Sequence, residues 1–141
     1  MTNRSVPVDT VLPHVIYQDL PAALSWLTAT FGFVLRYHYG EPLSGAQVHL
    51  GGAYIMLKQG ASSRVQPGGG TQSLTIFVPD VDAHYGRTRS AGARIVEELQ
   101  ETCYGERQYG VEDPEGHRWL FSQHAHDVDP EQWGATLAEE S

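Results

Sequence analysis

The chain has 141 residues, 40% of them hydrophobic, which is enough for a packed domain and too many for a disordered segment. Its formal net charge of −8, with only nine scattered Lys and Arg residues, argues against nucleic-acid binding. No apolar run approaches the roughly 20 residues that a membrane span needs, no signal core is visible, and the single cysteine, Cys103, has no partner for an internal disulfide. We therefore expect a cytoplasmic protein that is not bound to membranes.

The first half of the chain predicts a strand, a helix and three further strands. An apolar, β-branched run over 11–17 indicates the first strand. Asp19 is a suitable helix N-cap, apolar residues then recur at helical spacing, and Gly32 ends the helix. The three strands that follow are predicted at 33–39, 47–50 and 53–58.

The second half repeats this order. A strand is predicted at 73–78, Asp80 caps a helix that ends near Gly92, and Asp19 and Asp80 stand 61 residues apart (80 − 19 = 61), which indicates a repeat of pattern. The last three strands are predicted at 93–99, 104–112 and 117–123. The expected organisation is an N-terminal segment 1–10, one domain 11–124 with halves 11–60 and 71–124 joined by a Gly-rich linker 61–70, and an acidic C-terminal tail 125–141.

A short helix is expected in that tail at 130–138, with Trp133 and Leu137 on one side. It would pack on the domain or cover a partner subunit.

Several motifs mark the start of each half and the end of the second. Residues 19–24 read DLPAAL and are followed by FGF at 31–33, 78–83 read VPDVDA, and YGER at 104–107 precedes DPEGHRW at 113–119. In this order and spacing they resemble the metal-poor, bleomycin-resistance-like branch of the vicinal oxygen chelate superfamily (glyoxalase, bleomycin resistance, extradiol dioxygenase). The resemblance implies an α+β fold of two tandem βαβββ units, forming a curved mixed sheet around a concave cleft, with the helices on the outer face.

The resemblance also implies four metal-ligand positions, which carry His and Glu in the metal-dependent members. In this chain they fall on Leu12, on or next to Met56, on Ser73 and on Leu120. None of these side chains supplies an imidazole nitrogen or an anionic oxygen. We therefore expect no metal at this position and no other cofactor.

Strand side chains alternate between two faces, so the four positions also predict which neighbours face the cleft. Tyr104 and Arg107 are added as an aromatic and cationic lip. The predicted ligand-binding residues are Leu12, His14, Tyr54, Met56, Ser73, Thr75, Tyr104, Arg107, Arg118 and Leu120. Such a mixture of apolar, aromatic and a few polar groups is typical of a small-molecule pocket.

Catalytic residues are not identified by the pattern. His14 is a candidate base, although a lone strand His is commonly structural. Glu106 and Glu112 are candidate carboxylate bases, although such residues are more commonly solvated side chains at the edge of a strand. His124 and His126 could contact a metal together, but no third ligand is suitably spaced, so we do not predict a metal site there.

Three functions stay open. The leading one is a metal-independent binder that sequesters a small molecule, such as an antibiotic or metabolite, cationic to match the acidic chain, in clefts of a homodimer. The alternative is an enzyme of the same fold, a lyase, isomerase or dioxygenase with an atypical metal or none, in which His14, a glutamate or Arg118 performs acid–base work. The third is an interaction module whose own side chains fill the cleft.

Overall fold

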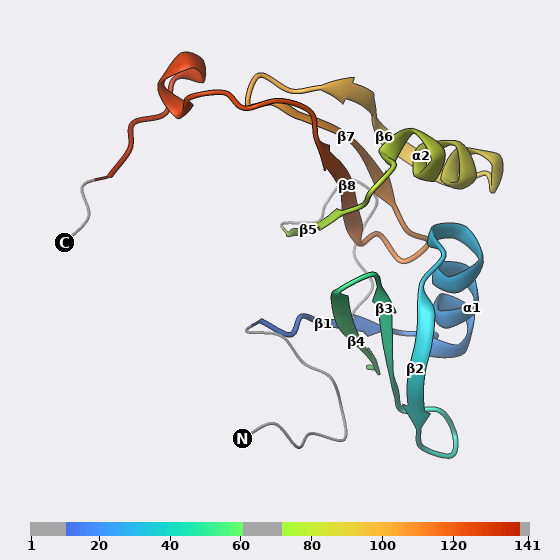
Figure 1. The fold of residues 1–141 in the computed structure, drawn as a ribbon. Helices are drawn as coiled ribbons and strands as arrows, with labels where there is room; N and C mark the ends of the chain where they lie inside the picture. Colours follow the sequence, from blue (N-terminus) through green and yellow to red (C-terminus); the bar gives the residue numbers. More distant parts are fainter. Residues whose placement is uncertain (1–10, 61–71, 139–141) are drawn as a thin grey trace. The chain divides into compact units, whose positions relative to one another are not determined.

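The computed structural model describes residues 11–60 and 72–138, so the predicted N-terminal segment 1–10 and linker 61–70 lie outside the described residues. Two βαβββ units follow each other along the chain, and each is a four-stranded mixed sheet with one helix (Figure 1). The predicted fold class is thus confirmed. In chain order the elements are β1 (His14–Tyr17), α1 (Leu20–Phe31), β2 (Val34–Tyr39), β3 (Gly45–Leu50), β4 (Ala53–Gln59), β5 (Ser73–Phe77), α2 (Val81–Ser90), β6 (Arg94–Glu101), β7 (Glu106–Glu112) and β8 (Arg118–His124).

The chain divides into two compact units. The first holds residues 11–60 together with the turn Pro114–His117, and the second holds 72–113 and 118–138.

In the first unit, sheet A has the strand order β1-β4-β3-β2. The outer strand β1 runs parallel to β4, and the other neighbours are antiparallel. Apolar residues of α1 recur every three or four positions and pack against one face of the sheet. The buried side chains of this layer include Val15, Tyr17, Leu27, Phe31, Val48 and Leu57. Each contributes roughly 1.5–3 kcal/mol through removal of apolar surface from water.

In the second unit, sheet B repeats this topology with the order β5-β8-β7-β6, and α2 packs on it. Its core contains Trp119 and Tyr109, which also carry polar groups. The indole nitrogen of Trp119 donates to a carboxylate oxygen of Asp113 at 3.1 Å, and the Tyr109 hydroxyl donates to Oγ1 of Thr88 at 2.8 Å. These buried groups therefore keep hydrogen bonds after leaving water.

Both helices begin in the same way. The side chains of Asp19 and Asp80 accept from the main-chain N–H three residues on, each at 3.1 Å, as the sequence predicts. A glutamine near the end of each unit's last strand adds a second cap: Gln59 accepts from Leu20 N–H and Gln123 from Val81 N–H, both at 2.9 Å. The repeat of pattern is thus also a repeat of hydrogen bonding.

The turn after β7 fixes the residues ahead of α1. The carboxylate of Glu115 accepts from the main-chain N–H groups of Gln18 and Asp19 at 2.7 and 2.9 Å. These hydrogen bonds help to explain why the turn Pro114–His117, although distant in sequence, belongs to the first unit.

The C-terminal segment differs from its prediction. Instead of a helix over 130–138, the structure has one turn of 3-10 helix, Pro130–Trp133. Gly134 follows with φ of 100°, a left-handed conformation that ends helices, and Trp133 and Leu137 are both exposed. Within the part of the chain that the structure describes, no helix is long and apolar enough to cross a membrane.

Candidate functional site

Each sheet has one face covered by its helix and one face on which its own unit packs no helix, although central residues of that second face such as Met56 and Gln47 are buried. In sheet A, Gln59 bonds to the first residue of α1 and shares its face with Ile55 and Leu57, so these residues face the helix. The alternate residues of β4, Tyr54, Met56 and Lys58, therefore lie on the opposite side. We call this side the open face of sheet A.

Strand pairing extends that face across the sheet in rows of neighbours. The middle row is His14, Met56, Gln47 and Tyr37, on β1, β4, β3 and β2. The flanking rows are Ile16, Lys58, Gly45 and Tyr39 on one side, and Tyr54, His49 and Val34 on the other. His14 and Tyr54 thus share a face with Met56, as strand alternation predicts.

Met56 is held at the centre of this face by two donors. The Tyr37 hydroxyl donates to its sulfur at 3.3 Å, and the side-chain amide of Gln47 donates to the same atom at 3.7 Å. A thioether is a weak acceptor, so these bonds orient the side chain more than they stabilise it. Sequence reasoning missed both partners.

Tyr37 reaches the open face because of a β-bulge. Leu35 pairs with Val48 and Tyr37 pairs with the next residue of β3, Gln47, so Arg36 is an extra residue between them. Without the bulge, strict alternation would place Arg36 on this face and Tyr37 on the other. The bulge thereby puts Tyr37 and Tyr39 on the same face as His49 and Tyr54, whose rings stack at 5.0 Å.

The open face of sheet B is polar by comparison. Its strongest feature is Glu112, whose side chain is only 3% exposed and lies between two guanidinium groups, 3.7 Å each from Arg94 Nε and Arg118 Nη2. Ser73 pairs with Arg118 on the same face, and Thr75 pairs with Leu120 one row further on. The four predicted residues of sheet B are therefore brought together on one face.

Two predicted residues lie elsewhere. Arg107 alternates with Gln108 and forms a two-pronged ion pair with Asp82 of α2, at 2.8–3.3 Å, so it is on the helix-covered face of sheet B. The hydrogen bond from Arg107 holds the pKa of the Asp82 carboxyl below its usual range. Tyr104 lies in the turn before β7, where its ring makes an edge contact with Trp133 at 5.7 Å. Arg107 therefore lies away from the other predicted residues of sheet B, which corrects its place in the expected lip, and a binding role of Tyr104 stays a prediction.

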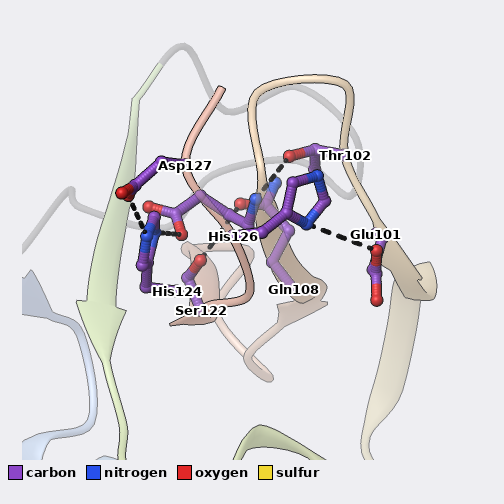
Figure 2. Close-up of polar contacts among 8 residues, drawn as sticks. Glu101, Thr102, Gln108, Ser122, His124, His126 and Asp127 are labelled. Carbon is purple, nitrogen blue, oxygen red and sulfur yellow. Dashed lines mark hydrogen bonds and ion pairs between the residues drawn. The ribbon is translucent and has the colours of Figure 1, made fainter. Parts of the chain in front are cut away.

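A cluster of imidazole and carboxylate groups lies at the end of β8 (Figure 2). The two ring nitrogens of His124 contact different carboxylates, Glu106 at 3.1 Å and Asp127 at 2.8 Å. Hydrogen bonds to Asp127 and then to Glu106 raise the pKa of His124 above its ordinary value. His126, which follows, is 4.0 Å from Glu101. This cluster fastens the segment after β8 to strand β7.

The predicted metal-ligand positions offer no suitable donor set. Leu12 and Leu120 carry hydrocarbon side chains, Ser73 an uncharged hydroxyl, and the Met56 sulfur already accepts two hydrogen bonds. Among residues 11–60 and 72–138, no group of three or more His, Cys, Asp or Glu is arranged to hold a metal ion. The residues therefore do not fit the metal that the resemblance implies for other members.

Comparison with known proteins places these observations in a family. A model of the Glyoxalase/Bleomycin resistance protein/Dioxygenase superfamily matches residues 8–121. Uncharacterized proteins of Mycobacterium bovis and Mycobacterium tuberculosis are each 28% identical to the chain over 137 residues. The matches cover 89% of this chain, with 90% of the M. bovis protein and 81% of the M. tuberculosis protein.

Solved structures resemble the chain over most of its length. TioX from Micromonospora sp. ML1 superposes with a TM-score of 0.70 at 32% identity, covering 83% of this chain and 99% of TioX. A Nocardioides protein described as a glyoxalase/bleomycin resistance protein/dioxygenase scores 0.66 at 16% identity, over 97% and 93% of the two chains. A bleomycin-binding protein solved with bleomycin scores 0.67 at 15% identity, over 83% and 99%. The last two likenesses are of fold.

Proposed function

Because the chain belongs to the Glyoxalase/Bleomycin resistance protein/Dioxygenase superfamily, we propose that it binds a small organic molecule and sequesters it unchanged, without a metal ion. The bound molecule is an antibiotic or a metabolite. The observation that carries the proposal is the open face of sheet A, which presents aromatic rings around Met56 at a position where the metal-dependent members carry a ligand. Such a face can contact a ligand and lacks the groups for metal-assisted chemistry.

The neighbours support this reading. One protein of the same fold was solved in complex with bleomycin, which it binds according to its description. The partly exposed tyrosines of this face suit this role because they contribute contact area, and the buried thioether of Met56 beside them can adapt to ligand shape.

The proposed binding residues follow from the two open faces taken separately. On sheet A they are Leu12, His14, Tyr54 and Met56, with Tyr37 added by the structure; on sheet B they are Ser73, Thr75, Arg118 and Leu120. That the two sets line one shared cleft stays a prediction. His14 contributes a hydrogen bond to the ligand in this proposal.

We further propose that the working form is a cytoplasmic homodimer. The outer strands β1 and β5 each have one edge that no strand of their own sheet covers, and exposed edges favour pairing with another chain.

The proposal is tested by a thermal-shift screen of small molecules against the full chain, before and after dialysis against EDTA. A ligand that binds the folded state raises the melting temperature. The same hits with the same shifts are expected in both samples. Hits that disappear after EDTA and return with added metal would contradict metal-independent binding, and a broad screen without any hit would contradict the binding function.

A further inference from the structure

The acidic charge of the chain is absent from the open face of sheet A. In residues 11–60 the acidic residues are Asp19, which caps α1, and Glu41, in the turn between β2 and β3. The described residues that strand pairing places on this face include Lys58 and the imidazoles of His14 and His49, and none of them is Asp or Glu. The net charge of −8 therefore says nothing about a ligand of this face, whose own charge is positive.

Flat rings occupy both ends of the same face. Tyr37 and Tyr39 lie at a ring distance of 6.3 Å and are tilted by 31°, and His49 stacks on Tyr54 with a tilt of 20°. Gly45 makes room for one of them, since a Cβ at that position would lie 2.3 Å from the Tyr39 ring. The Tyr39 side chain thus lies flat against the strand. Rings presented in this way stack on other flat, unsaturated molecules.

Hydrogen-bond donors lie in the middle row of this face, around Met56. The Tyr37 hydroxyl and the Gln47 amide point at the sulfur of Met56, a weak acceptor. A carboxylate oxygen is a much stronger acceptor, because a charged partner roughly doubles the strength of a hydrogen bond. Lys58 is two residues from Met56 along β4 on the same face, about 7 Å away along the strand. Met56 and Gln47 are themselves only 6% and 0% exposed, whereas Tyr37 and Lys58 are half-buried. An anionic group next to the Tyr37 hydroxyl would therefore gain a donor and a cation together.

We propose that the open face of sheet A binds a flat aromatic molecule that carries a carboxylate. The ring system stacks on the tyrosines, and the carboxylate accepts from Tyr37 and pairs with Lys58. This ligand class replaces the cationic one expected from the net charge. The inference rests on the proposed binding function and specifies its ligand.

The test uses three probes of one shape and different charge: 2-naphthoate, 2-naphthamide and 2-naphthylmethylamine. Calorimetric titration of the full chain at pH 8 is expected to show naphthoate binding about tenfold more tightly than the amide, the gain typical of one charge-assisted hydrogen bond. The cationic amine is expected to bind more weakly than the amide.

Variants locate the charge preference. Lys58→Met should bring the ratio of naphthoate to naphthamide affinity close to one, and Tyr37→Phe, which keeps the ring, should reduce it severalfold. Arg89→Met removes an equal charge from α2, where the Arg89 side chain is 67% exposed, and is expected to leave the ratio unchanged. The unfolding midpoint of each variant is recorded, so that a variant with a damaged fold is recognised.

The outcomes separate the two proposals. Equal affinities for the three probes, tighter binding of the amine, or a ratio insensitive to Lys58→Met would overturn the aromatic-carboxylate assignment. If none of the three probes binds while the thermal-shift screen finds other ligands, this inference fails and the binding function stands. If neither experiment finds a ligand, both fail.

Discussion

Met56 and Arg107 show how the partner of a side chain decides its role. Met56 stands where the resemblance implies a metal ligand in other members, yet its sulfur accepts hydrogen bonds from Tyr37 and Gln47 and is only 6% exposed. Arg107 has the chemistry of an anion clamp, but its guanidinium is already paired with Asp82. Residue type alone predicts neither role, because the partners of both side chains come from other elements of the fold.

His124 provides a prediction at the residue scale. Its pKa is raised by Asp127 and Glu106, so folding stabilises the charged imidazolium relative to the unfolded chain. The contact of the C-terminal segment through Asp127 is thus fully present below the ordinary histidine pKa, while the carboxylates are ionised, and it weakens as the pH rises through the raised pKa. Proton NMR titration of the His124 ring should give a pKa above the ordinary value of about 6.5.

Two variants identify the cause. Asp127→Asn is expected to lower the pKa of His124, whereas Glu131→Gln removes a carboxylate further along the same segment and should leave it nearly unchanged. A wild-type His124 that titrates at or below its ordinary value would show that the two carboxylate contacts do not form in solution.

At the scale of elements, each helix relies on a glutamine from a distant strand. Gln59 and Gln123 accept from the first main-chain N–H of α1 and α2, a group with no partner inside the helix. Gln59 also donates through its amide to the main-chain oxygen of Gln18. In both units, a glutamine side chain thus connects the end of the sheet to the start of the helix by a hydrogen bond.

We therefore expect Gln59→Ala and Gln123→Ala each to lower the free energy of unfolding by about 1 kcal/mol, the usual value of a helix-capping hydrogen bond. Urea denaturation followed by circular dichroism measures the change. Gln100→Ala, in an exposed position of β6, is the control and should have little effect. A loss no larger than that of the control would mean that the glutamine caps contribute nothing to stability.

The order and type of the elements could be predicted because their signals are local. Asp19 and Asp80 cap helices, and Gly32 ends one with φ of 82°, all within a few residues of the elements they bound. The sequence also predicts which side chains of β4 and β8 point away from the helix, because side chains alternate between the two faces along regular strands. The bulge at Arg36 could not be predicted, because it arises from pairing with β3. Tyr37, the donor beside Met56, was missed as a result.

At the scale of the whole molecule, exposed apolar residues on the outer strands support the proposed homodimer. Ile16 on β1 is 44% exposed and Phe77 on β5 is 63% exposed, and they stand at equivalent places of the repeat (77 − 16 = 61). Light scattering at micromolar concentration is expected to give twice the chain mass of 15.6 kDa.

Charged substitutions should then weaken the dimer. Ile16→Glu and Phe77→Glu would bury a carboxylate in the proposed interface and are expected to shift the mass towards the monomer. Val34→Glu, an equally exposed apolar position on the other outer strand of sheet A, is the matched control. A wild-type protein with the mass of a single chain would rule out the dimer at these concentrations.

The central claim is that a small molecule binds on the open face of sheet A, and one NMR measurement tests it directly. The chain has two methionines, so a sample labelled with ¹³C in the methionine methyl groups gives two signals, and Met56→Leu identifies the one from Met56. On titration with a ligand from the thermal-shift screen, the account predicts that the Met56 signal moves in a saturable way while the Met1 signal stays in place. A ligand that raises the melting temperature and leaves the Met56 signal unchanged at saturation would contradict the claim.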